Sequence, residues 1–186
     1  HKKSKRQVYF PFEQIILLEG KGTTTRSDYN GKYFRGDLYL SFPGINNLHS
    51  LRFKFRGEKQ SENDYLFRRN VNFVYGYTNG FDFSSFLGGG VEYEAPVFYP
   101  DISIGPLAYI QRVRMTGFIN VGQITGVGQN NYVESPRSLG GEIKFDLNLF
   151  RQSFLFDLGF RFSYLLNNNY NQDQTTFNIT LGSISF

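Results

Sequence analysis

The sequence lacks cysteine altogether and contains only two histidines. The absence of cysteine excludes a disulfide framework and a metal site built on thiolates. His1 and His49 alone cannot supply a clustered metal site. We therefore expect neither a metal nor a cofactor.

Long hydrophobic runs are missing as well. Hydrophobic residues make up 40% of the chain, and no apolar run approaches the roughly 18 residues of a membrane-spanning helix. This excludes a helical membrane protein. It leaves room for a membrane β-barrel, because half of each strand in such a barrel is polar.

Charge is nearly balanced, with a formal net charge of +4 and one dense basic run at His1–Arg6. We interpret this run as a solvated tail rather than a nucleic-acid or lipid site. Residues 1–13 are thus predicted to be a basic periplasmic segment, and residues 14–186 the barrel portion. The chain shows no initiator methionine and no signal peptide, so we expect a mature product or a fragment.

What the sequence does contain is alternation. Apolar residues occupy the odd positions of residues 139–149 and the even positions of residues 154–164, with mostly polar residues or glycine between them. Such period-two patterns predict two β-strands, each with one apolar and one polar face. The short polar step between them predicts an antiparallel hairpin. Each run has roughly the 10 residues that a tilted strand needs to cross a bilayer.

The same alternating pattern occurs about eight times along the chain. Weaker or shorter runs of the same kind occupy residues 14–20, 34–42, 51–56, 87–97, 113–121 and 177–186. The connections after the odd-numbered strands are long and polar, and those after the even-numbered strands are mostly shorter. Outer-membrane barrels have this asymmetry. The longest connection is predicted at residues 57–85 and is assigned to the extracellular side.

Alternation alone does not say whether the apolar face meets a core or lipid. Lipid is favoured because the polar faces mix both charge signs with glycine, as at Glu142, Lys144 and Arg161. Aromatic residues, 18% of the chain, gather near strand ends, and Phe186 closes the last strand. We therefore predict an all-β, transmembrane antiparallel β-barrel in the lipids of the outer membrane. In the last strand the apolar residues change from odd positions, up to Leu181, to even positions, from Ile184. This change predicts a bulge or kink at Gly182.

The sequence indicates no catalytic chemistry. Ser50 beside His49 is interpreted as a turn pair, and Glu92, Glu94 and Glu142 as residues of a hydrated wall. Residues 87–90 (LGGG) are no phosphate loop, because a strand continues through them. Their small size instead lets another segment press against the wall. We expect the protein not to be an enzyme.

Four motifs follow one another along the chain. Residues 74–77 read VYGY and lie in the longest connection, and residues 88–96 read GGGVEYEAP, a glycine-rich strand that continues with a glutamate, an aromatic residue and a proline. Residues 118–122 read FINVG, and residues 137–142 read RSLGGE. In this order they resemble the V-R-G-F/Y loop motif, the glycine-rich strand, the F-x-D-x-G strand and the R-x-S-x-G strand of the Omp85 family of outer-membrane assembly and translocation proteins. The resemblance covers about residues 57–186.

The resemblance implies a fold and a function. Family members form sixteen-stranded barrels behind periplasmic POTRA domains, and they insert or translocate other β-rich proteins through a weak seam between the first and last strands. With about half the strands, this chain resembles the C-terminal half of such a barrel. Its partners would be the remaining strands or a partner chain, and client outer-membrane or surface proteins. The residues of the seam strand would be Phe177, Ile179, Leu181, Ile184 and Phe186. The alternative is a small closed eight-stranded barrel for adhesion or envelope anchoring.

The resemblance also implies a plug inside the barrel. Its motif would be Tyr75, Gly76 and Tyr77. The wall that it contacts would be Gly88, Gly90, Glu92, Phe118 and Asn120.

The chain departs from the family pattern within this plug. Tyr75 replaces the family's arginine and Asn120 replaces one of its acids, whereas Glu92 remains. We expect the loop to fold inward nonetheless, with the Tyr75 hydroxyl bonded to Glu92 or Asn120, and with Arg68 or Arg69 available to substitute for the arginine. The alternative is a loop that projects outward.

Overall fold

The computed structural model describes residues 12–24, 30–61, 65–68, 72–77, 82–105, 107–126, 133–149, 155–167 and 173–184. These residues form ten β-strands in one antiparallel sheet. The prediction of an all-β antiparallel chain is confirmed. Of the residues named above, His1, Arg6, Arg69 and Phe186 lie outside the described part, as does position 154 at the start of the second run of the hairpin.

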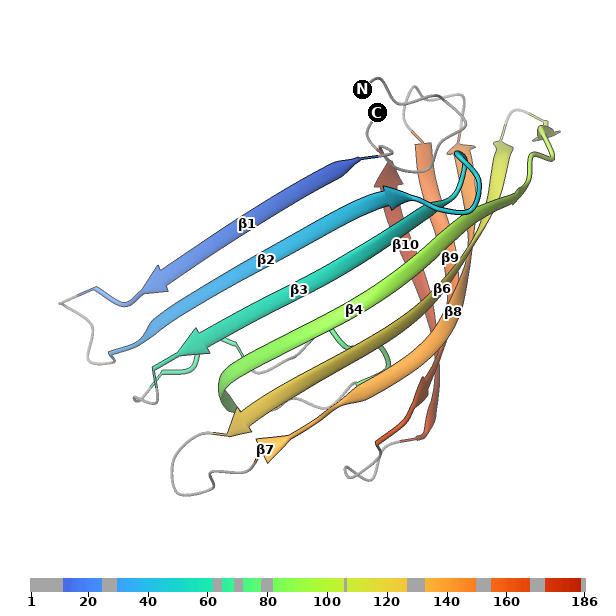
Figure 1. Ribbon diagram of the computed structural model, residues 1–186. Coiled ribbons are helices and arrows are strands. Elements are labelled where there is room, and N and C mark those ends of the chain that lie inside the picture. The colour runs from blue at the N-terminus through green and yellow to red at the C-terminus, as the bar shows by residue number, and fades with distance from the viewer. Residues whose placement is uncertain are drawn as a thin grey trace.

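Eight long strands cross the sheet in chain order (Figure 1). They are β1 (Glu13–Gly22), β2 (Lys32–Pro43), β3 (Ser50–Gln60), β4 (Phe83–Phe98), β6 (Ala108–Gly126), β8 (Arg137–Leu149), β9 (Leu155–Leu165) and β10 (Thr175–Ile184). Two short strands, β5 (Ile102–Ile104) and β7 (Val133–Glu134), pair with the two ends of β6. The alternation did not predict the short strands.

The connections differ in length between the two rims of the sheet. One rim, called the long-connection rim from here on, carries connections 23–31, 61–82, 127–136 and 166–174. The opposite rim carries connections 44–49, 99–107 and 150–154, which are mostly shorter. The longest connection is shorter than the predicted 57–85, because β3 continues to Gln60 and β4 begins at Phe83.

The sheet curls but does not close. Figure 1 shows β9 and β10 turning behind β4 and β6. Within the described residues, β1 pairs only with β2 and β10 only with β9, so the two edge strands do not hydrogen-bond to each other. Each edge therefore presents backbone N–H and C=O groups that no neighbouring strand satisfies.

The strand register separates the long strands into two faces. The inner face lies inside the curl, and representative residues on it are Asp37, Lys54, Glu92, Asn120 and Glu142. The outer face carries the alternate residues, among them Ile16, Leu38, Phe55, Ile143 and Leu181.

Burial on these faces is the reverse of that in a water-soluble β-protein. On the outer face, Leu181 is 73% exposed and Ile16 is 69% exposed. On the inner face, Asp37 is only 2% exposed and Glu142 only 4%. Among the described residues, more of the buried side chains are polar or charged than hydrophobic.

Ion pairs across the strands account for the buried charge. Arg114 contacts both Glu94 and Asp146, with its Nη2 atom 2.7 Å from Asp146 Oδ1. Arg56 pairs with Asp37 in the same way. A buried charge is tolerated only when it is paired and hydrogen-bonded, and these ion pairs supply the partners of the charges on the inner face.

The predicted bulge at Gly182 is wrong. The pairing of β10 with β9 runs without a shift from Thr175 to Ile184. A side chain at Gly182 would collide with the Asp157 carboxylate, so the glycine serves close packing on the inner face rather than a kink. Irregularities occur instead between Phe83 and Ser85, between Pro96 and Phe98, and between Ile110 and Arg112.

Candidate functional site

Residues 72–77 of the connection between β3 and β4 lie against the inner face of the sheet. Phe73 and Val74 are buried, Val74 being only 1% exposed. They form a hydrophobic cluster with Phe83, Phe86 and Ile124, and Tyr77 packs against it. The segment therefore folds inward, as the sequence led us to expect, and its apolar residues pack against apolar side chains of the inner face such as Phe86 and Ile124.

The Tyr75 hydroxyl joins an ion pair on this face. It donates a hydrogen bond to Glu92 Oε1 at 3.0 Å and accepts one from Lys54 Nζ at 3.2 Å. Lys54 and Glu92 themselves are 2.6 Å apart. Burial raises the pKa of Tyr75 far above its ordinary value, so the hydroxyl stays neutral and remains a donor.

Lys54 reaches this position because its neighbour has no side chain. Lys54 lies directly opposite Gly90 in the register of β3 and β4. A Cβ atom at Gly90 would lie 3.1 Å from Lys54 Cε, and it would also crowd the Asn120 amide. The absence of that atom lets the lysine pass over Gly90 and meet Glu92 on the diagonal.

The ring of Tyr75 is held as firmly as its hydroxyl. The ring packs edge-on against Phe118, with the two centroids 4.9 Å apart. The Arg161 guanidinium lies 3.8 Å from the centroid of the Tyr75 ring, and Arg161 Nη2 is anchored 3.0 Å from Glu142 Oε2. Cation–π contacts of this kind are favourable, and more so where water is excluded.

The tight approach of the loop depends on glycines in both surfaces. Gly76 has φ = +96°, and a Cβ atom there would lie about 3 Å from Leu165, Ser163 and Thr176. On the wall, a side chain at Gly88 would collide with Phe73. Larger residues at Gly76 or Gly88 would therefore push the segment away from the sheet.

Tyr77 ties the end of the described loop segment to the long-connection rim. Its hydroxyl donates to the backbone oxygen of Asn167 at 2.6 Å and accepts a bond from the backbone N–H of Arg137 at 3.2 Å. The inward segment thus contacts strand β4, strand β6 and the rim at β8 and β9.

Of the two acceptors expected for the Tyr75 hydroxyl, Glu92 takes the hydrogen bond and Asn120 does not. Its side chain is fully buried, but neither amide atom has a hydrogen-bond partner in the described part of the structure. The hydroxyls of Ser138, Ser163 and Thr176 nearby in the register also lack one there.

Arg68 does not substitute for the family's arginine. Its Nη1 atom donates to the Tyr33 hydroxyl at 3.3 Å, and its Nε atom lies 3.9 Å from Glu58 Oε2. Lys54 and Arg161 supply the positive charge around Tyr75 instead. Parity placed both residues on the polar face, but only the register and the curl of the sheet reveal that they meet the loop.

The expected seam residues lie on the edge strand β10. Phe177, Ile179 and Leu181 are on the outer face and largely exposed. Ile184 is within β10, but its side chain lies outside the described part, as does Phe186.

Other candidate groups are engaged in local contacts. His49 Nδ1 lies 2.7 Å from the Tyr93 hydroxyl, and Glu92, Glu94 and Glu142 each pair with a lysine or arginine. Within the described residues, no three histidine, aspartate or glutamate side chains gather as a metal site. The same residues contain no helix long and apolar enough to span a membrane.

Comparison with known proteins adds no relative: no family model, no curated protein and no solved structure matches this chain.

The contribution of Tyr75 can be measured through its hydroxyl. In a Val74→Cys background, whose thiol would be the only one in the chain, Tyr75→Phe should raise the rate of maleimide labelling about tenfold or more. The loop would lose hydrogen bonds to charged groups, which are worth about 1.5–3 kcal/mol. Tyr93→Phe removes a comparable hydroxyl at the opposite rim and serves as the control. Equal labelling in both variants would show that the Tyr75 hydroxyl does not hold the loop.

Proposed function

We propose that this chain is part of an outer-membrane β-barrel of the Omp85 type, which inserts or exports β-barrel or surface proteins without covalent chemistry. The observation that carries the proposal is the reversed distribution of side chains, with apolar residues on the outer face and paired charges on the inner face.

A hydrocarbon environment explains the outer face. Large apolar side chains such as Ile119, Ile179 and Leu181 are more than half exposed there, and they lie on one continuous sheet surface. Contiguous apolar surfaces of this size are unfavourable in water, at about 25 cal/mol per Å². Lipid removes that cost, while the polar inner face retains the contacts of a hydrated interior.

The unpaired edges support an assembly role. In hydrocarbon, each unsatisfied backbone group costs several kcal/mol, so β1 and β10 need partners there. Further strands of a larger barrel would supply stable partners. A strand of a client protein would supply a transient one, by the same backbone hydrogen bonds that add a peptide to a sheet edge.

The inward segment supports the same proposal. A loop anchored at Tyr75 and Tyr77 keeps the inner face occupied while the edges remain available. The work of the protein is then conformational: backbone hydrogen bonds are exchanged, and no side chain needs to act as an acid, base or nucleophile.

The test is an insertion assay in liposomes. The protein, reconstituted into the bilayer, should accelerate the folding of a urea-unfolded outer-membrane β-barrel, measured by its heat-modifiable migration in electrophoresis. A cysteine at Ile179 on the edge strand should form disulfides with single cysteines in an edge strand of the client, whereas a cysteine at Ile119, in the middle of the sheet, should not. Folding no faster than in empty liposomes would contradict the proposal.

A further inference from the structure

The outer face carries charge at one rim only. On the eight long strands, the charged residues of this face are Lys32, Lys59 and Arg137, and its described positions include no aspartate or glutamate. All three lie where a strand meets the long-connection rim: Lys32 and Arg137 begin β2 and β8, and Lys59 is next to the end of β3. All other charged residues of these strands face inward or lie at the β6 bulge.

These three cations differ from the inner-face cations in forming no ion pair with a carboxylate of the described residues. Lys32, Lys59 and Arg137 are exposed, and no described carboxylate forms an ion pair with any of them. Lys59 lies opposite Phe34, which places it diagonally from Lys32 on the neighbouring strand. Diagonal neighbours are about 7–8 Å apart, a spacing at which two like charges repel unless an anion lies between them.

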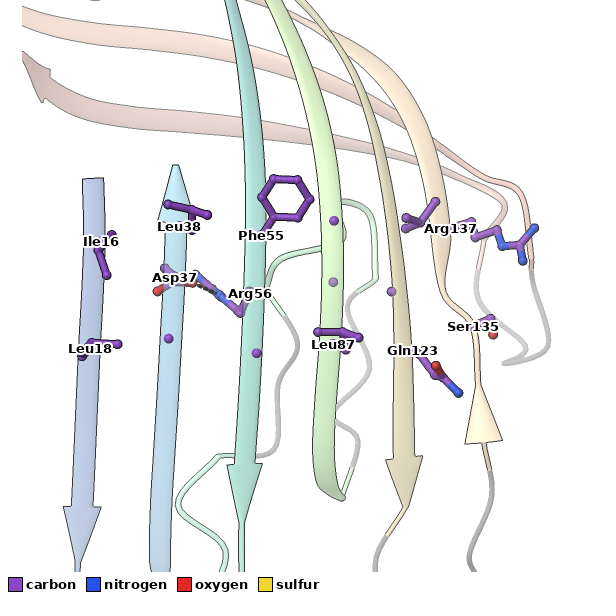
Figure 2. Close-up of a pocket in the computed structure, with 16 residues that line it drawn as sticks. Ile16, Leu18, Asp37, Leu38, Phe55, Arg56, Leu87, Gln123, Ser135 and Arg137 are labelled. Carbon is purple, nitrogen blue, oxygen red and sulfur yellow. Dashed lines mark hydrogen bonds and ion pairs between the residues drawn. The ribbon is translucent and has the colours of Figure 1, made fainter. Parts of the chain in front are cut away.

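An apolar groove of about 840 Å³ adjoins these cations on the outer face. It exists because Gly36 and Gly57 face each other across β2 and β3, and Gly89 lies beside them on β4. Figure 2 shows lining side chains from neighbouring strands, among them Leu18, Leu38, Phe55 and Leu87. The apolar walls are Ile16, Leu18, Leu38, Phe55, Leu87 and Val121.

The cations border the groove on the side of the long-connection rim. Lys59 is two residues beyond Gly57 on the same face of β3, a distance of about 7 Å along a strand. Arg137 lies at the β8 end of the groove, and its guanidinium extends beyond that end (Figure 2). The surface is therefore amphipathic, with an apolar groove and positively charged side chains along one side of it.

We propose that this groove binds the acyl chains of an anionic lipid, whose phosphate-bearing headgroup contacts Lys32 and Lys59. This rests on the proposed function, since it requires the outer face to lie in a bilayer. A partner helix would also fit close to small residues. The charge distribution favours the lipid, because cations that pair with no described carboxylate, all along one side of the groove, complement an anionic headgroup at one depth of the membrane.

The experiment uses tryptophan as a reporter, because the chain contains none. Leu87→Trp places it in the groove, and Ile179→Trp places it on the outer face of β10, away from the groove. The full chain is reconstituted into bilayers in which either the anionic phosphatidylglycerol or the zwitterionic phosphatidylcholine carries brominated acyl chains. Brominated phosphatidylglycerol should quench the groove tryptophan with an apparent affinity about fivefold higher per contacting lysine. The reporter on β10 should show no preference.

Two variants test the two halves of the site. Lys32→Gln with Lys59→Gln should remove the preference for the anionic lipid while leaving quenching by phosphatidylcholine unchanged. Gly57→Leu should fill the groove and weaken quenching of the groove reporter; a Cβ atom at this position meets no atom within 4 Å, so the change is compatible with the strand. Gly117→Leu adds the same group at an equally open position of the outer face that does not line the groove, and it should have no effect.

The outcomes separate the two proposals. Strong but equal quenching of the groove reporter by both lipids would overturn the lipid site and leave the membrane assignment standing. Equal effects of Gly57→Leu and Gly117→Leu would overturn it as well. If neither brominated lipid quenches either tryptophan, the proposed function itself is overturned.

Discussion

Glu92→Ala should destabilise the folded protein by about 3–5 kcal/mol, because it leaves the Lys54 ammonium buried without its carboxylate. The same change removes the acceptor of the Tyr75 hydroxyl. The measurement is urea-induced unfolding of the reconstituted chain, followed by tyrosine fluorescence or by heat-modifiable migration. The inward loop should loosen together with the wall.

Two further variants identify the cause of this loss. Replacing both charges, Lys54→Met with Glu92→Leu, should recover most of the stability, because a well-packed apolar pair carries no unpaired buried charge. Glu19→Ala breaks the surface pairs of Glu19 with Lys21 and Arg35, of which Arg35 keeps its pair with Asp37, and it should leave the stability close to wild type. A double variant as unstable as Glu92→Ala would show that the volume of these side chains, rather than their charge, supports the wall.

Ile143→Arg should cost about 2–4 kcal/mol if the outer face meets the middle of a bilayer. Ile143 is the central residue of β8 and faces outward, opposite Met115 and Phe160. Leu139→Arg, on the same face of β8 but next to Arg137 at the rim, should cost about 0–1 kcal/mol because the arginine reaches the headgroups there. The free energy of unfolding in lipid vesicles measures both.

This pair of variants discriminates between lipid and water around the outer face. Both residues are about 40% exposed, so in water the two arginines should have similar and small effects. A cost that depends on depth is specific to hydrocarbon. Equal and small losses at Ile143 and Leu139 would contradict the membrane assignment.

The strands and their faces were predictable where one face is consistently apolar. Around Ile143 and Phe160, every second residue is hydrophobic, so parity alone assigned Glu142 and Arg161 to the polar face. The end of β3 was missed because Glu58, Lys59 and Gln60 are polar on both faces, which hides the alternation. A strand end with polar residues on both faces shows no alternation of apolar and polar residues, so the sequence does not reveal it.

The site was predictable in part. The family resemblance predicted that Tyr75 meets the strand that carries Glu92, and alternation placed Glu92 on the polar face. Neither could show that Lys54 crosses above Gly90, since that depends on the register between β3 and β4. The contact of Arg161 with the Tyr75 ring depends on the curl that turns β9 toward β4. Curvature accumulates over several strands and leaves no mark at any one residue.

The neutrality of Tyr75 has a consequence for the kinetics of the loop. When Tyr75 leaves the inner face, Lys54 and Glu92 remain paired with each other. Release of the loop therefore moves a neutral side chain and breaks no ion pair. An arginine in its place would have to carry a full charge out of a carboxylate site and across the hydrated interior. With tyrosine, the rate of release should be nearly independent of ionic strength, because screening acts on charges that move apart.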